Sequence, residues 1–238
     1  MINEDFDLGK INDVDWTDTF ADSDDNAVDD KIREFIDKYV EIIYMNRSRR
    51  NVYVTPSFAV TADGKVELLM PDDMPDDEPL SYGVTVQIRT KDPNSHFGKF
   101  GSIKDMLCGM SLTDMPDINI NVIDMDIEHL YGLPDSVRDL CISKCASLDD
   151  LSGIPKNVNG DLRLYLHPST RVNTMPERIR FLFIGDYHFK LTKDVIDMLP
   201  YNIKYISVIS LDGQLYDEEL ISLLDRHRSA DGSIKIIR

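Results

Sequence analysis

A quasi-repeat in the second half of the chain constrains its fold more than any other feature. Four segments share the form apolar-Pro-x-x-aliphatic, at residues 133–137, 154–158, 175–179 and 199–203, so they recur at intervals of 21, 21 and 24 residues. A short alternation of apolar and polar residues follows each segment. Regular self-similarity at this period predicts a solenoid of stacked repeats, and solenoids commonly bind other macromolecules.

Each repeat carries a triplet of aliphatic residues that we expect to face inward from a strand. Val137, Leu140 and Ile142 follow the spacing L-x-x-L-x-L. The other triplets are Ile179, Leu182 and Ile184, then Ile203, Ile206 and Val208, then Val158, Leu162 and Leu164 with one residue inserted at Asn159-Gly160, and a degenerate first unit of Ile120, Ile123 and Met125. The spacing therefore predicts five strands with a shared buried face.

The unit that begins at Val137 also matches a known repeat beyond its aliphatic spacing. Cys145 lies where leucine-rich repeats carry Asn or Cys, and inward positions continue at Leu148, Leu151 and Ile154. Residues 147–162 are similar to a phrase repeated in a divergent bacterial and bacteriophage version of these repeats. On this basis, residues 116–210 resemble the leucine-rich-repeat family.

The resemblance implies a fold, a function and a compartment. It implies a short solenoid with parallel strands in a non-enzymatic protein that binds other proteins. It also implies a bacteriophage protein that acts on a host or phage protein in the cytoplasm of the bacterial host. Glu128, His167, Tyr187 and Leu211 replace the Asn or Cys in the other units, so we expect an irregular solenoid. An ordinary α/β domain with strands at similar spacing is the alternative fold.

The alternate positions of these strands would face the open side of the sheet, because side chains alternate between two faces along a strand. The candidate partner-binding residues at these positions are Tyr165, Phe181, Phe183, Tyr205 and Arg163. An exposed aromatic patch of this kind predicts a binding site. The alternative is that another part of the chain covers the patch: the N-terminal domain, the C-terminal helix, or Phe6, Trp16 and Phe20 of the N-terminal segment.

Two regions are expected before the solenoid. Residues 1–26 form an acidic segment that is either flexible or folds onto a partner or onto the rest of the chain. Residues 27–112 predict an α+β domain, in which a long helix packs on a short antiparallel sheet. Its expected elements are a helix over 28–43, strands over 52–54, 58–61, 65–70 and 84–89, a hairpin turn at Asp63-Gly64 and a short helix over 103–112.

The solenoid region, residues 113–238, is expected to end in a cap, because the last repeat of a solenoid exposes its core. The sequence predicts a helix over 217–227, a turn at Asp231-Gly232 and a final strand over 234–237. The predicted fold is thus an α+β N-terminal domain followed by a short, irregular leucine-rich-repeat-like solenoid with parallel strands.

The charge of the chain limits its partners. The formal net charge is -17, and such an acidic surface disfavours direct binding to nucleic acid. It favours a protein partner with a basic surface. The alternative is an acidic inhibitor that mimics nucleic acid and places residues 1–30 and 71–78 in the basic groove of a DNA- or RNA-binding protein.

Motifs for catalysis, metals and membranes were not found. The chain has no Gly-rich phosphate loop, no nucleophile motif and no histidines at metal-binding spacing, so we expect no enzyme activity and no cofactor or metal. It has neither an apolar run long enough for a transmembrane helix nor a secretory signal, so no membrane association is expected. Three cysteines make no disulfide framework, which favours a reducing cytoplasm.

Overall fold

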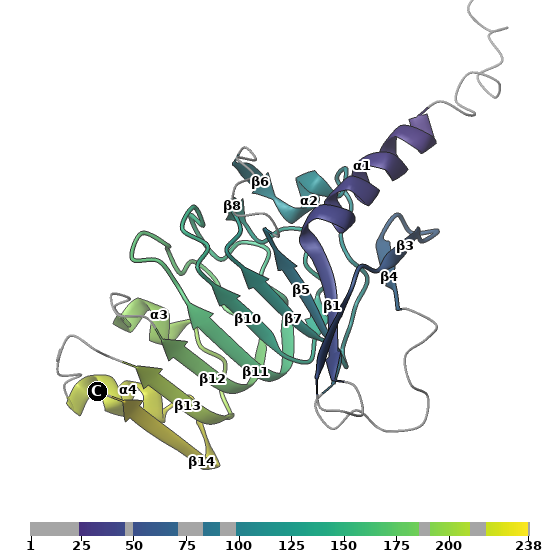
Figure 1. Cartoon of the computed structure of the whole chain (residues 1–238). Helices are drawn as coiled ribbons and strands as arrows, with labels where there is room; N and C mark the ends of the chain where they lie inside the picture. The colour runs from purple at the N-terminus through teal and green to yellow at the C-terminus, as the bar shows by residue number, and fades with distance from the viewer. Residues whose placement is uncertain are drawn as a thin grey trace, which may run out of the picture.

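One large sheet dominates the computed structural model, which describes residues 24–45, 50–70, 83–90, 99–185, 191–209 and 218–237 (Figure 1). Its strands are β1 (Val40–Met45), β2 (Asn51–Val54), β5 (Thr85–Arg89), β7 (Asn119–Ile123), β9 (Ser136–Val137), β10 (Leu140–Ser143), β11 (Asn157–Tyr165), β12 (Arg178–Gly185), β13 (Ile203–Ile209) and β14 (Arg228–Ile237). Nine of these ten strands follow the order β14-β13-β12-β11-β10-β7-β5-β1-β2, and β9 pairs with β11 beside that path.

The sheet is mixed but largely parallel. Every neighbouring pair from β5 through β7, β10, β11, β12 and β13 to β14 is parallel. The antiparallel pairs of this sheet are β1 with β2 and β1 with β5. The described fold is therefore mostly β, with few helices, and the parallel strands predicted from the repeat are confirmed.

Aliphatic side chains of the parallel strands form two rows on the buried face of the sheet. The rows are Ile120, Leu140, Leu162, Leu182 and Ile206, and Val122, Ile142, Leu164, Ile184 and Val208, none more than 3% exposed. Burial of each such side chain contributes about 1.5–3 kcal/mol. The inward strand positions predicted for β10 to β13 are confirmed. In β7 the prediction was wrong, because Val122 rather than Ile123 pairs with Ile142 and faces the core.

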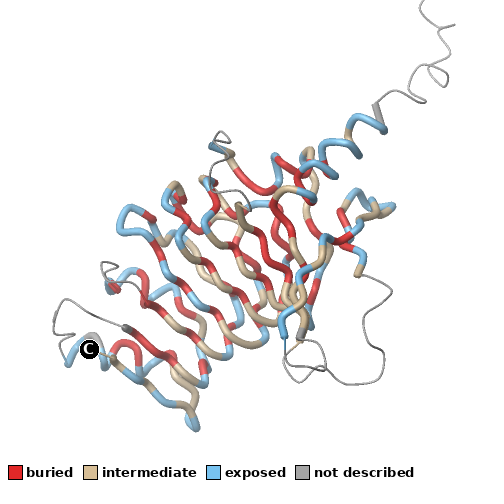
Figure 2. The backbone as a smooth tube through the Cα atoms, in the orientation of Figure 1, coloured by how far each residue is buried: buried red, intermediate tan, exposed pale blue. Residues whose placement is uncertain are grey.

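Backbone hydrogen bonds also join successive chain segments on the other side of the core. There β6 (Phe100–Ser102) pairs in parallel with β8 (Ile127–His129). The amides of Lys104 and Leu130 donate to the carbonyls of Tyr131 and Ser152, at 2.7 and 2.8 Å. Each segment thus lies against the next on both sides of the core, and Figure 2 shows the buried residues along the middle of the stack.

Glycines make two of these stacking contacts possible. Gly153 has φ +88°, and a Cβ placed on it would lie 2.2 Å from the backbone nitrogen of Tyr131. Gly132 has φ +100°, and a Cβ placed on it would lie 2.4 Å from the backbone nitrogen of Lys104. Both residues occupy the turn before an apolar-Pro pair of the repeat, so the turns pack backbone against backbone.

The N-terminal helix is shorter than the sequence predicts. Helix α1 (Asp24–Tyr39) buries Ile32, Phe35, Ile36 and Tyr39 on one face. The predicted helix ran to residue 43, but Val40 and Ile43 belong to β1. β-Branched residues favour strands, and β1 gains backbone hydrogen bonds from two partners, β2 and β5.

A separate hairpin follows β2. Strands β3 (Ser57–Val60) and β4 (Val66–Leu69) are antiparallel, and Gly64 has φ +73° in the turn, so the predicted hairpin is confirmed. Helix α2 (Ile103–Met106) is one turn long, against the prediction of 103–112. The sequence predicts a domain boundary between residues 112 and 113. Strand β5, before this boundary, pairs with β7, after it, so both predicted domains contribute strands to the same sheet.

Two helices and a long strand complete the C-terminal part. They are α3 (Lys193–Asp197), α4 (Glu218–Asp225) and β14. The predicted turn at Asp231-Gly232 lies inside β14, where the register with β13 shifts between Ile203 and Tyr205. Between Arg228 and Ser233, β14 has three more residues than the facing part of β13, so the pairing is interrupted there and then resumes.

Several predictions concern residues outside the described ranges. They include the acidic segment up to residue 23, the acidic loop over 71–78, and Tyr187 and Leu211 of the repeat. Across the described ranges, no helix combines the length and apolar character needed to cross a membrane.

Candidate functional site

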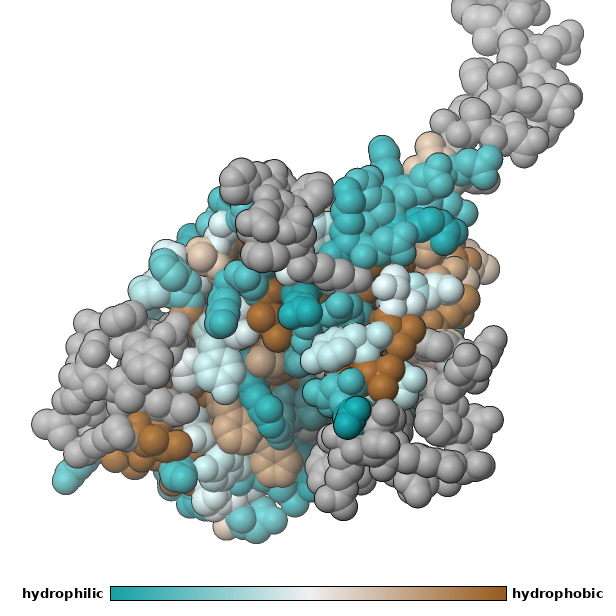
Figure 3. Space-filling view, viewed as in Figure 1, coloured by the Kyte–Doolittle hydropathy of each residue, from teal (hydrophilic) through white to brown (hydrophobic). Residues whose placement is uncertain are grey.

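The face of the sheet opposite the aliphatic rows carries all five predicted binding residues. Strand register places Asp161, Phe181 and Tyr205 in one row across β11, β12 and β13. Arg163 and Phe183 lie side by side in the next row, and Tyr165 follows Arg163 on β11. Figure 3 views this open face, on which hydrophobic side chains gather over β11 and β12 with hydrophilic ones beside them.

Four of these residues form what we call the aromatic cluster: Tyr165, Phe181, Phe183 and Tyr205. The Phe183 and Tyr205 rings contact each other with centroids 5.5 Å apart. The Arg163 guanidinium lies 5.5 Å from the Phe183 centroid, and that of Arg180 lies 5.0 Å from Phe181. Tyr165 is 39% exposed and the other three rings are half-buried, so part of each ring remains accessible.

A small polar cavity of about 130 Å³ adjoins the aromatic cluster. We call it the polar hollow; its lining is Thr85, Asn119, Asn121, Asp139, Leu140, Cys141, Asp161 and Arg163. The Asp139 carboxylate accepts the backbone N–H of Asp161 at 2.8 Å, which closes the bulge at the inserted Asn159-Gly160. No sequence motif predicted this site. The one sequence signal for it was the presence of asparagine at positions 119 and 121, because residues two apart in a strand share a face.

Charge pairing fixes Arg163 between the polar hollow and the aromatic cluster. Its guanidinium donates to the Asp161 carboxylate at 2.5 Å. Burial lowers the pKa of Arg163, but the hydrogen bond and charge of Asp161 outweigh it and raise the pKa overall. Arg163 therefore stays cationic, and its plane is available both to an aromatic ring and to a carboxylate.

The cysteine in the polar hollow is a poor nucleophile. Burial raises the pKa of the Cys141 thiol, although the nearby Arg163 charge opposes this shift. A protonated thiol reacts slowly, because the thiolate is the nucleophilic form. Cys145 faces the core as predicted, and burial raises its pKa to about 11. Neither Cys141 nor Cys145 is thus an activated nucleophile.

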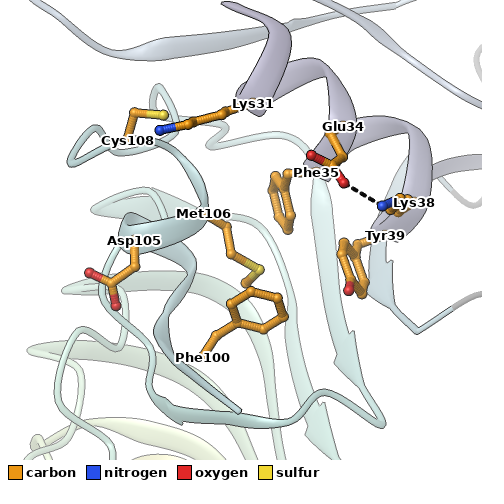
Figure 4. Close-up of a pocket in the computed structure, with 9 residues that line it drawn as sticks. All are labelled: Lys31, Glu34, Phe35, Lys38, Tyr39, Phe100, Asp105, Met106 and Cys108. Atoms are coloured by element: carbon orange, nitrogen blue, oxygen red, sulfur yellow. Dashed lines mark hydrogen bonds and ion pairs between the residues drawn. The ribbon is translucent and has the colours of Figure 1, made fainter. Parts of the chain in front are cut away.

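A second cavity, of about 270 Å³, lies between α1 and the segment of β6 and α2 (Figure 4). We call it the α1–α2 pocket. Phe35 and Tyr39 of α1 face Phe100 and Met106 across it, and charged groups lie at its rim. No sequence pattern predicted this pocket, because its two sides are more than 60 residues apart in the chain.

Comparisons provide no further assignment of either site. No protein-family model, no curated protein and no solved structure matches the chain. Among the residues that the structure describes, no group of three or more His, Cys, Asp or Glu side chains is placed to hold a metal ion.

Proposed function

We propose that this chain is a non-enzymatic protein-interaction module that binds its partner on the open face of the sheet. The architecture we infer is a short, irregular, leucine-rich-repeat-like solenoid over about residues 116–210, preceded by the α1-containing region and closed by α4 and β14. The observation that carries the proposal is the aromatic cluster, in which Phe183 and Tyr205 pack together beside Arg163 on one sheet face.

The composition of this face suits a binding hot spot. Tyr and Arg are enriched among the residues that dominate binding energy, and aromatic rings supply large contact areas. Phe181, Phe183 and Tyr205 project from parallel strands whose backbones are hydrogen-bonded on both sides. A preorganised surface of this kind loses little conformational entropy when a partner binds.

The polar hollow would add specificity at the edge of the apolar contact. It combines the donor groups of Asn121 and Arg163 with the carboxylate of Asp161. With a formal net charge of -17, the chain would attract a partner with a basic surface and raise its association rate. The proposed setting, by resemblance alone, is a bacteriophage protein acting in the cytoplasm of its bacterial host.

The test compares capture of a partner from bacterial lysate by three proteins. The wild type is set beside a Phe183→Ala/Tyr205→Ala variant and a control variant, Tyr131→Ala/Tyr201→Ala, which removes two exposed rings away from the open face. We expect the first variant to lose at least about 30-fold in affinity for the captured protein, as removal of hot-spot side chains does. The control variant should bind as the wild type does.

Equal binding by both variants, with far-UV circular dichroism unchanged, would contradict the proposal. The nucleic-acid-mimic alternative predicts a different pattern. Under that alternative, neutralising Asp72, Asp73, Asp76 and Asp77 abolishes binding, and affinity falls steeply with salt.

A further inference from the structure

The α1–α2 pocket has the size and lining of a site for one aromatic side chain. Phe35 and Tyr39 stack with centroids 5.7 Å apart, and Phe100 meets the Tyr39 ring edge-on at 6.0 Å. Met106 lies against them at the floor of the pocket (Figure 4). The volume of about 270 Å³ falls just below the range of about 300–1,000 Å³ usual for small-molecule sites. A single ring therefore suits it better than a larger ligand.

One positive charge at the rim of this pocket has no acidic partner among the described residues. Lys38 pairs with Glu34, and the Asp105 carboxylate accepts the Ser102 hydroxyl at 2.9 Å. Lys31 makes no such contact, and its ammonium group extends across the mouth toward Cys108 (Figure 4). The rim thus favours an aromatic group that carries a carboxylate next to it.

The chain itself contains such a group just before α1. Residues 1–23 carry seven acidic residues and one lysine, and the only tryptophan, Trp16, lies between Asp15 and Asp18. We propose that the Trp16 indole binds in the α1–α2 pocket with a neighbouring carboxylate beside Lys31. This inference goes beyond the proposed function and does not depend on it.

Chain length favours Trp16 over Phe20, the aromatic residue just before α1. Trp16 is eight residues before Asp24, and eight extended residues span about 26 Å. Phe35 lies 11 residues along α1 from Asp24, about 16 Å at 1.5 Å per residue. Phe20, four residues before the helix, reaches only about 13 Å. The strands that carry the aromatic cluster, β11 to β13, lie toward the end of the sheet away from α1 (Figure 1), so the pocket is also the nearer apolar site.

Tryptophan fluorescence of the full chain tests the proposal directly, because Trp16 is the only tryptophan in the sequence. We expect a blue-shifted emission and weak quenching by acrylamide in the wild type. Lys31→Glu should shift the emission to the red and raise the quenching constant. Lys235→Glu is the matched control, with the same change of charge at an exposed lysine on β14. It should leave both quantities unchanged.

Two fluorescence outcomes would overturn the proposal. One is a wild-type emission typical of a solvent-exposed indole. The other is release of Trp16 by Lys235→Glu but not by Lys31→Glu, which would place the N-terminal segment on the open face of the sheet.

Alkylation of Cys108 gives a second, independent readout. Cys108 lines the pocket and is half-buried, so a bound indole would shield it. In full-length Trp16→Ala we expect Cys108 to react with N-ethylmaleimide about tenfold faster, which corresponds to a docked population of about nine-tenths in the wild type. Peptide mass spectrometry measures this rate separately from that of Cys141, which should not change. An unchanged Cys108 rate would refute the docking of Trp16.

Discussion

Replacing Gly153 by alanine should destabilise the protein through two separable effects. The first is conformational, because Gly153 adopts φ +88°, which L-residues with a Cβ avoid. The second is steric, because the new Cβ would lie 2.2 Å from the backbone nitrogen of Tyr131 and 2.5 Å from the carbonyl carbon of Leu130. Backbone atoms cannot rotate away as a side chain can, so the stacked turns must separate.

Gly109 provides a matched control for the conformational effect. Its φ is +87°, and a Cβ placed on it meets nothing within 4 Å. Gly109→Ala should therefore cost only the left-handed conformation, about 1–2 kcal/mol. Gly153→Ala should add about 1–3 kcal/mol for the overpacked contact, for a total of about 2–5 kcal/mol.

Urea denaturation followed by far-UV circular dichroism measures this difference. With a slope of about 2 kcal/mol per molar urea, the midpoint should fall by about 0.5–1 M for Gly109→Ala. For Gly153→Ala it should fall by about 1–2.5 M. If the two variants unfold at the same midpoint, the close approach between Gly153 and Tyr131 does not limit the packing of the turns, and the reasoning is wrong.

Two further predictions concern titrating groups. Burial raises the pKa of Asp150, but hydrogen bonds from Ser152 and the contact with His129 outweigh it, so the pKa lies below its ordinary value. Its stabilising effect is therefore present above about pH 4 and lost as the pH falls through the lower folded-state pKa. Asp150→Asn should reduce stability at pH 7 and weaken its decline toward pH 3, as measured by urea titrations at both pH values. Cys145 has a pKa of about 11 and therefore stays protonated at pH 8. A disulfide reagent should label it more slowly than Cys141 in the folded protein, and the two should react equally fast in urea. Equal rates in the folded protein would contradict the burial of Cys145.

The sequence predicted the parallel strands because their side chains alternate strictly. Leu162 and Leu164, like Leu182 and Ile184, are aliphatic at every second position, and one buried face requires this pattern. The hairpin at Gly64 was equally local, since its turn chemistry lies within a few residues. Such features depend on neighbours in sequence and can be inferred without knowledge of distant contacts.

Other features depended on contacts that the sequence does not encode locally. Val40 and Ile43 fit a helical face as well as a strand, and pairing with β5 and β2 decides between them. Val122 and Ile123 are adjacent aliphatic residues, so only the register with β10 selects the inward one. The degenerate first unit was misjudged for this reason.

The binding face could be anticipated in part. Tyr165, Phe183 and Tyr205 were assigned to one face from alternation alone, and strand register then fixed which of them are neighbours. The polar hollow combines side chains from β5, β7, β10 and β11, and the α1–α2 pocket joins segments far apart in the chain. Sites of this kind appear only once the order of the strands and the packing of the helices are known.

The pairing of each parallel strand with its neighbours in chain order has a consequence for folding. From β7 to β14, successive parallel strands pair residues that are 20–28 positions apart in the chain, so these contacts close short loops. Short loops are quick to form, and this favours folding that starts locally and spreads strand by strand. Loss of β14 exposes a single new edge at β13, whereas loss of β10 divides the sheet into two parts. Loss of the edge strand therefore leaves the rest of the sheet paired, whereas loss of a central strand does not.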